Sequence, residues 1–80
     1  MESLLTVQKA VGTKQVKKAI LKGMVTKVYI AEDAEQHVIK PLVELCSENS
    51  IQVEFVESME TLGKASGIAV GSAAVALLTE

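Results

Sequence analysis

The sequence predicts an α/β fold in which helices cover both faces of one small β-sheet. Two observations lead to this class. Apolar residues recur with a helical period in some segments and as short, strand-like runs in the segments between them. Several of those runs are apolar on both sides, as expected for strands that are covered on both faces. A chain of 80 residues can build one modest core, so we expect a single domain spanning residues 1–80.

The first half of the chain is predicted to hold two helices and a strand. A short helix is expected over residues 3–10, which contain three large apolar side chains. Thr13 is a plausible N-cap for a second helix over residues 14–22, which Gly23 would end. Residues 25–31 predict a strand buried on both sides, because Val28, Tyr29 and Ile30 are consecutive and apolar. The second helix has an apolar face and a basic face, formed respectively by Val16, Ala19 and Ile20 and by Lys14, Lys18 and Lys22.

The middle of the chain predicts one long helix. Asp33 is expected to be its N-cap, with Gln36 as the partner in a capping box. The helix should extend to about Asn49. Pro41 is expected to kink or restart it, because proline lacks a backbone donor and clashes with the preceding turn.

The last third predicts two strands around a short helix. Residues 51–56 alternate apolar and polar side chains and favour a strand. Ser58 should cap a helix that ends near Ser66 and Gly67. Residues 73–78 form the final apolar strand. In the strand over 51–56, the alternating apolar residues are Ile51, Val53 and Phe55.

Charge is distributed unevenly along the chain, although the net charge is only −2. Residues 1–27 carry six lysines and one glutamate, whereas residues 28–80 carry two lysines and nine acidic residues. This asymmetry suggests either a polyanion bound to one face or a solvated, lysine-rich helix. Charge alone leaves both interpretations open.

Several classes of protein are disfavoured by composition. Tyr29 and Phe55 are the only aromatic residues, which argues against RNA-binding modules that stack bases on exposed rings. Cys46 is alone, so no internal disulfide and no multi-cysteine zinc site is possible. We expect a reduced, cytoplasmic protein. Residues 68–78 are too short a run for a membrane span, which needs about 20 residues, and the N-terminus lacks the pattern of a signal peptide.

The side chains that carry catalysis are scarce. His37 is the only histidine and should lie in the first turn of an exposed helix, where a solvated role is expected. Cys46 fits the core better than a nucleophilic site. The pair Gly63–Lys64 follows neither nucleotide-binding glycine pattern, because Ser58 stands where the phosphate loop needs glycine. We therefore expect no catalytic residue, no metal and no cofactor.

Two motifs remain as candidates for binding. In residues 11–18, Gly12 permits a close approach of the backbone, and the following helix start offers free amides and a positive dipole to phosphate. Gln15 and the lysines that follow could pair with base edges. The second motif, residues 67–71, is an apolar loop flanked by glycines. It is either a simple passage from helix to strand or a platform for unstacked bases.

These motifs resemble the L7Ae and L30e ribosomal-protein family of kink-turn RNA binders, and in particular its small bacterial YbxF-like branch. The resemblance extends over essentially the whole chain. It is carried by three blocks, namely Gly12-Thr13-Lys14-Gln15-Val16, then Val28-Tyr29-Ile30-Ala31-Glu32-Asp33-Ala34, and finally Leu62-Gly63-Lys64-Ala65 with residues 67–76.

The resemblance implies a three-layer α/β/α sandwich with a small mixed sheet, in which the first and third blocks meet at one edge. It also implies a monomer that binds a kink-turn in structured RNA, with ribosomal RNA or a riboswitch-like leader as candidate targets and the ribosome as a candidate partner. The alternatives are an RNA of another shape bound by the same fold, and a protein–protein adaptor using the acidic face of residues 32–60. By position, the implied RNA-binding residues are Gly12, Thr13, Lys14, Gln15, Lys18, Lys22, Ile68, Ala69, Val70 and Gly71.

Overall fold

Four strands form one mixed sheet in the computed structural model, which describes residues 8–67 and 71–79. Their order across the sheet is β1-β4-β2-β3. Strands β2 and β3 are parallel, whereas β4 runs antiparallel to both β1 and β2. The predicted α/β class with a small mixed sheet is confirmed. The strands are β1 (Lys9–Val11), β2 (Val25–Ala31), β3 (Gln52–Val56) and β4 (Ala74–Leu78).

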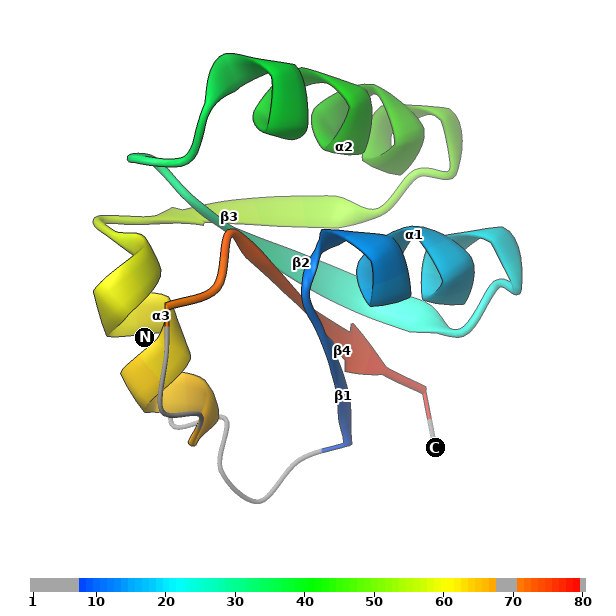
Figure 1. Cartoon of the computed structure of the whole chain (residues 1–80). Helices are drawn as coiled ribbons and strands as arrows, with labels where there is room; N and C mark the ends of the chain where they lie inside the picture. Colours follow the sequence, from blue (N-terminus) through cyan, green and yellow to red (C-terminus); the bar gives the residue numbers. More distant parts are fainter. Residues whose placement is uncertain (1–7, 68–70, 80) are drawn as a thin grey trace.

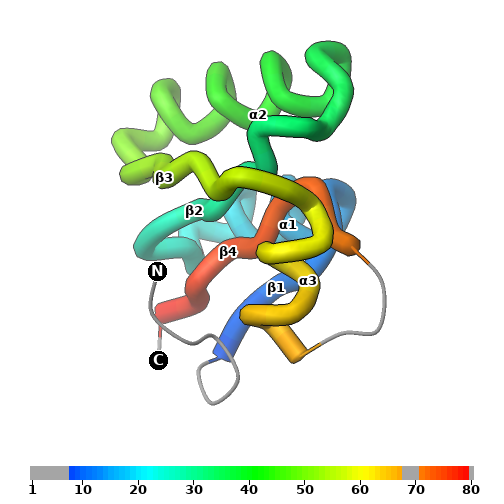
Figure 2. The backbone as a smooth tube through the Cα atoms, turned by 90° about the vertical axis from the view of Figure 1, so that its left-hand side faces the viewer, coloured from blue at the N-terminus to red at the C-terminus, as the bar shows by residue number. Residues whose placement is uncertain are grey.

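Three helices cover the two faces of this sheet (Figure 1). Helices α1 (Thr13–Leu21) and α2 (Gln36–Glu48) share one core with the sheet, and α3 (Met59–Ser66) belongs to another. Figure 2 shows α3 in front of the strands and α1 behind them. The three-layer α/β/α arrangement is therefore confirmed.

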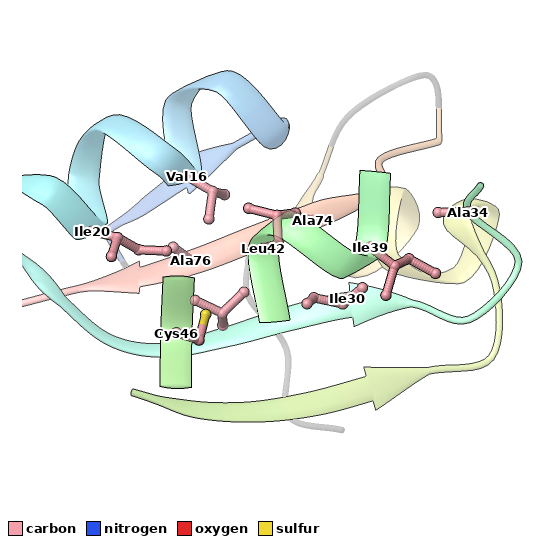
Figure 3. Close-up of a cluster of buried hydrophobic side chains, with 10 residues drawn as sticks. Val16, Ile20, Ile30, Ala34, Ile39, Leu42, Cys46, Ala74 and Ala76 are labelled. Carbon is pink, nitrogen blue, oxygen red and sulfur yellow. The ribbon is translucent and has the colours of Figure 1, made fainter. Parts of the chain in front are cut away.

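The larger core lies between the sheet and the helices α1 and α2 (Figure 3). Leu42 and Cys46 of α2 are completely buried there, and burial of one leucine side chain contributes about 1.5–3 kcal/mol. The smaller core, under α3, contains the side chains of Tyr29 and Ala31. The larger core consists of Val16, Ile20, Val28, Ile30, Ala34, Ile39, Leu42, Cys46, Ala74 and Ala76.

Most helices and strands begin and end close to the residues predicted from the sequence. Strand β2 spans residues 25–31 as predicted, and β4 begins one residue later than expected. The Ser58 hydroxyl accepts a 3.1 Å hydrogen bond from the Thr61 amide and so caps α3. Gly67 ends α3 in the left-handed conformation, with φ of 78°.

The predicted helix over residues 3–10 is wrong where the structure describes it. Residues 1–7 lie outside the described residues, but Lys9–Val11 is a strand. These three residues pair with Leu77, Ala76 and Val75 of β4, so contacts with a distant strand determine their conformation. The spacing of apolar residues within one segment cannot reveal a partner strand elsewhere in the chain.

The start of α2 also differs from the prediction. Its N-cap is Glu35, and Gln36 is the first helical residue, so Asp33 lies outside the helix and caps nothing there. The helix continues through Pro41 without restarting. Pro41 is exposed, so water can reach the His37 carbonyl, one turn earlier, that a proline leaves without its helical donor.

Strand β3, predicted over residues 51–56 and observed over Gln52–Val56, lies at one edge of the sheet. Of the alternating apolar residues that predicted this strand, Phe55 is 48% exposed. Ile51 and Val53 pack partly against the larger core. Only one side of β3 has a neighbouring strand, so side chains near its free edge keep contact with water.

Candidate nucleic-acid interface

The first binding motif is joined to the start of β4 at Gly12. The Gly12 amide donates a 2.9 Å hydrogen bond to the Ala74 carbonyl, and this brings α1 beside the turn that precedes β4 (Figure 1). Gly12 has φ of 96° and ψ of 149°, a conformation that essentially only glycine adopts. The glycine is therefore required by the backbone, and the space around it is open.

The N-terminus of α1 is uncapped. Gly12 is the N-cap and provides no side chain, so the prediction that Thr13 caps this helix is wrong. Thr13 is already the first helical residue. The first helical bond runs from the Val16 amide to the Gly12 carbonyl, which leaves the amides of residues 13–15 without helical acceptors. Together with the helix dipole, these free donors form an arrangement suited to an anion such as phosphate.

The lysines of α1 are exposed and, among the described residues, are not neutralised by an acidic side chain. Lys14, Gln15, Lys18 and Lys22 are all exposed. Within residues 8–67 and 71–79, the ion pairs join Lys27, His37 and Lys64 to nearby glutamates, and none involves a lysine of α1. A cationic surface therefore adjoins the free helix amides.

A groove of about 340 Å³ lies between α1 and strand β1. Three of the predicted residues, Gln15, Lys18 and Lys22, contribute to one wall of it, whereas Lys14 does not line it. The groove is also lined by Lys9, Met24 and Leu78, which were not predicted from the sequence. Their separation along the chain hides their proximity, so the sequence offers no signal for them; in the structure Met24 is apolar yet 42% exposed.

The second motif lies only partly within the described residues. Ile68, Ala69 and Val70 fall outside them, and Gly71 is exposed at the turn before β4. A Cβ on Gly71 would lie 3.1 Å from Met59, so this position also needs a small residue.

The Ala74 carbonyl connects the two motifs. It accepts hydrogen bonds from the Gly12 amide at 2.9 Å and from the Ser72 hydroxyl at 2.8 Å, which uses both of its lone pairs. Ser72 is buried, and its amide donates to the Met59 carbonyl. The start of α1 and the turn at Gly71 are thus fixed against the same atom, although they are some sixty residues apart in sequence.

Other chemistry receives little support from the described residues. Burial raises the pKa of the Cys46 thiol, which keeps it protonated inside the larger core. No group of three histidine, cysteine or acidic side chains is placed to hold a metal ion in the described ranges. Among the same residues, none of the helices is long and apolar enough to cross a membrane.

The fold and this surface define a small α/β/α protein with an uncapped helix N-terminus and a lysine-lined groove at one edge of the sheet. Residues 4–80 match the sequence profile of the ribosomal protein L7Ae/L30e/S12e/Gadd45 family, and the chain belongs to this family. The family expected from the three sequence blocks is therefore confirmed.

Relatives with similar sequences come from bacteria and archaea. An RNA-binding protein of Caldanaerobacter subterraneus is 45% identical over 69 residues, which cover 86% of this chain and 84% of the relative. The RNA-binding protein YbxF of Geobacillus stearothermophilus is 44% identical, with 85% and 83% covered. The large ribosomal subunit protein eL8 of Halobacterium salinarum is 43% identical, with 84% of this chain and 57% of that protein covered.

Solved structures show the same fold. A Bacillus halodurans protein of unknown function aligns with a TM-score of 0.81 and 33% identity, covering 88% of this chain and 70% of that one. A 15.5 kD RNA-binding protein of Giardia lamblia aligns with a TM-score of 0.84, covering 90% and 61%; at 22% identity this similarity concerns the fold alone.

Proposed function

We propose that the protein binds kink-turns in structured RNA and stabilises their bent form. The observation that carries this proposal is the junction at the Ala74 carbonyl, where the basic start of α1 and the turn at Gly71 are held together. A bent RNA brings phosphates and unstacked bases close to one another. The start of α1 suits the phosphates, and the loop that ends at Gly71 suits the unstacked bases. The names of the relatives, RNA-binding proteins and a large-subunit ribosomal protein, support an RNA ligand.

Each part of the surface has a distinct role in this proposal. The free amides after Gly12, together with Thr13 and Lys14, receive a phosphate at the positive end of the helix dipole. Gln15 and Lys18 reach base edges, where lysine favours the O6 and N7 atoms of guanine. The apolar loop residues Ile68, Ala69, Val70 and Gly71 cover bases that leave the stack, and Lys22 extends the basic surface.

Binding of this kind acts by selecting a conformation. A kink-turn exchanges between extended and bent forms, and a protein that binds only the bent form shifts the population toward it by its difference in affinity. The natural targets that fit are ribosomal RNA and riboswitch-like leaders. We further propose that the chain acts as a monomeric, single-domain bacterial protein in the cytoplasm, by binding and not by catalysis.

Selectivity for the bent RNA tests the proposal. Affinity is measured at one stated salt concentration for a kink-turn and for a control RNA of equal length, in which the sheared G·A pairs are replaced by Watson–Crick pairs. Clearly tighter binding to the kink-turn is expected. Equal affinities would instead indicate recognition of another RNA shape. Absence of RNA binding, with a partner captured on the acidic face of residues 32–60, would favour the protein adaptor.

A further inference from the structure

The groove between α1 and β1 continues beyond the residues that the proposed function uses. Lys9, Met24 and Leu78 line it together with Lys18 and Lys22. We propose that this groove holds the phosphate backbone of the RNA stem adjoining the kink, an inference that rests on the proposed function and extends its footprint along the stem.

The edge of β1 supplies one wall with free backbone donors. Pairing partners alternate along an antiparallel strand, and on β1 the Gly12 amide and the Gln8 carbonyl are bonded to β4. Lys9 and Val11 occupy the intervening positions, so their backbone groups point away from β4. Both residues line the groove, and no strand covers this edge of the described sheet. Their amides can therefore donate to phosphate oxygens.

The α1 wall supplies a row of long polar side chains. Gln15, Lys18 and Lys22 recur at intervals of three and four residues and so share one face of the helix. From Gln15 to Lys22 the helix rises by about 10.5 Å at 1.5 Å per residue. The row is therefore long enough to face more than one phosphate of the same RNA strand.

The groove suits a nucleic-acid strand better than a peptide. Its floor includes the apolar side chains of Ala19 and Met24, which can pack against sugars, and its charged walls carry lysines alone. An added peptide strand would need a longer partner than β1, which has only 3 residues. Phosphate complements both the lysines and the free amides.

Shortening the RNA stems identifies the strand in the groove. We would compare a kink-turn with two long stems and two versions in which one stem is shortened to end beside the kink. Lys9→Gln and Lys22→Gln remove the charge and keep a polar side chain only one atom shorter. Each is expected to weaken binding to the long RNA by about 3- to 10-fold and to reduce the salt slope by about 0.9. The penalty should vanish for one of the shortened RNAs.

Lys17→Gln is the matched control, because Lys17 is an exposed lysine of the same helix that does not line the groove. It should change affinity by less than about 2-fold. Circular dichroism of each free variant checks that the fold is kept. The groove proposal is overturned if Lys22→Gln costs the same with all three RNAs, or no more than Lys17→Gln.

The same titrations separate this inference from the kink-turn assignment. The unsubstituted protein is also compared on the kinked RNA and its Watson–Crick control. If the protein prefers the kinked RNA but Lys9→Gln and Lys22→Gln do not weaken binding, the groove proposal is rejected and the kink-turn proposal stands. If the protein shows no preference for the kinked RNA, but the loss of affinity in Lys9→Gln and Lys22→Gln depends on stem length, the groove proposal is supported and the kink-turn proposal is rejected. If no RNA is bound, both proposals are overturned.

Discussion

The Asp33 carboxylate accepts a 2.8 Å hydrogen bond from the backbone amide of Met59, the first residue of α3. Asp33 lies in the turn between β2 and α2, so it caps a helix that begins 26 residues later in the chain. The Met59 carbonyl in turn accepts a bond from the Ser72 amide. Asp33 thereby supports the turn at Gly71 from a distance, through the first residue of α3.

We expect Asp33→Ala to reduce the free energy of unfolding by about 1 kcal/mol, the usual cost of removing a helix cap. RNA affinity should also fall, because Met59 would hold Ser72 and Gly71 less firmly. Urea denaturation and RNA titration measure the two effects. Glu35→Ala serves as the control, since Glu35 is the N-cap of α2 but its exposed side chain makes no capping hydrogen bond and pairs with the exposed His37. Equal stability of the two variants would contradict a capping role for Asp33.

Gly12→Ala should destabilise the protein by about 1–3 kcal/mol, because φ of 96° with ψ of 149° strains any side chain. No clash contributes, since nothing lies within 4 Å of the added Cβ. Gly23→Asn provides a comparison: Gly23 has φ of 70°, a region that asparagine tolerates. Urea midpoints that fall equally for both variants would show that φ alone does not explain the need for Gly12.

Gln15→Ala and Lys18→Ala should each cost about 1–3 kcal/mol of binding free energy if these side chains reach base edges. Stability should not change, because both side chains are exposed and the buried face of α1 consists of Val16, Ala19 and Ile20. Lys40→Ala, an exposed lysine on α2, is the control and should have little effect. If Lys40→Ala reduces RNA affinity as much as Lys18→Ala does, the RNA-binding face has been assigned to the wrong part of the surface.

The sequence predicted those parts of the fold that depend on local patterns. Strand β2 follows from a run of apolar residues, and α3 follows from Ser58 and Gly67, whose capping roles are local. The predictions were wrong where contacts with residues distant in sequence determine the local structure. Asp33 has the residue type and spacing of an N-cap, but its acceptor oxygen serves Met59 instead of α2. Lys9–Val11 is a strand because β4 lies beside it.

The candidate site divides in the same way. Gly12 and the lysines of α1 stand out in the sequence because they are close together along the chain. Ser72 and Leu78 do not, since their roles depend on hydrogen bonds to residues far away in sequence and on the shape of a groove. The missing cap of α1 was also unpredictable, because Thr13 can cap a helix but enters this one as its first residue.

The apolar loop and the α1 lysines should respond differently to salt. Val70 lies outside the described residues, and its proposed contact with RNA is uncharged. Val70→Ala should cost about 1–2 kcal/mol of binding by the loss of two methyl groups, without changing the salt slope. Val70→Asp should weaken binding strongly, because it brings a carboxylate close to phosphate.

Lys14→Ala, in contrast, should reduce the salt slope by about 0.9 if Lys14 contacts a phosphate. Binding titrations at several salt concentrations measure these slopes. Thermal melting of the free protein provides the check on Val70. A large drop in melting temperature for Val70→Ala, with RNA affinity intact, would assign Val70 to the core and remove it from the site.

The ion pair between Lys27 and Glu54 should make stability depend on pH. The Lys27 Nζ atom lies 2.8 Å from Oε1 of Glu54, and joins β2 to the edge strand β3. The hydrogen bond from Lys27 lowers the pKa of Glu54 below its ordinary value of 4.5. The same bond raises the pKa of Lys27 above 10.5. The folded state therefore favours the charged form of both groups.

The direction in which stability changes with pH follows from these two pKa shifts. The contribution of Glu54 is complete above pH 4.5 and is lost as pH falls through its lower folded pKa. That of Lys27 is complete below pH 10.5 and is lost above its raised pKa. Glu54→Gln should therefore lower the melting temperature at pH 7, with the difference shrinking toward pH 3. Glu60→Gln, which removes the exposed pair with Lys64 and one charge in the first turn of α3, should have a smaller effect. A Glu54→Gln difference that persists at pH 3 would show that the charge of Glu54 is not its cause.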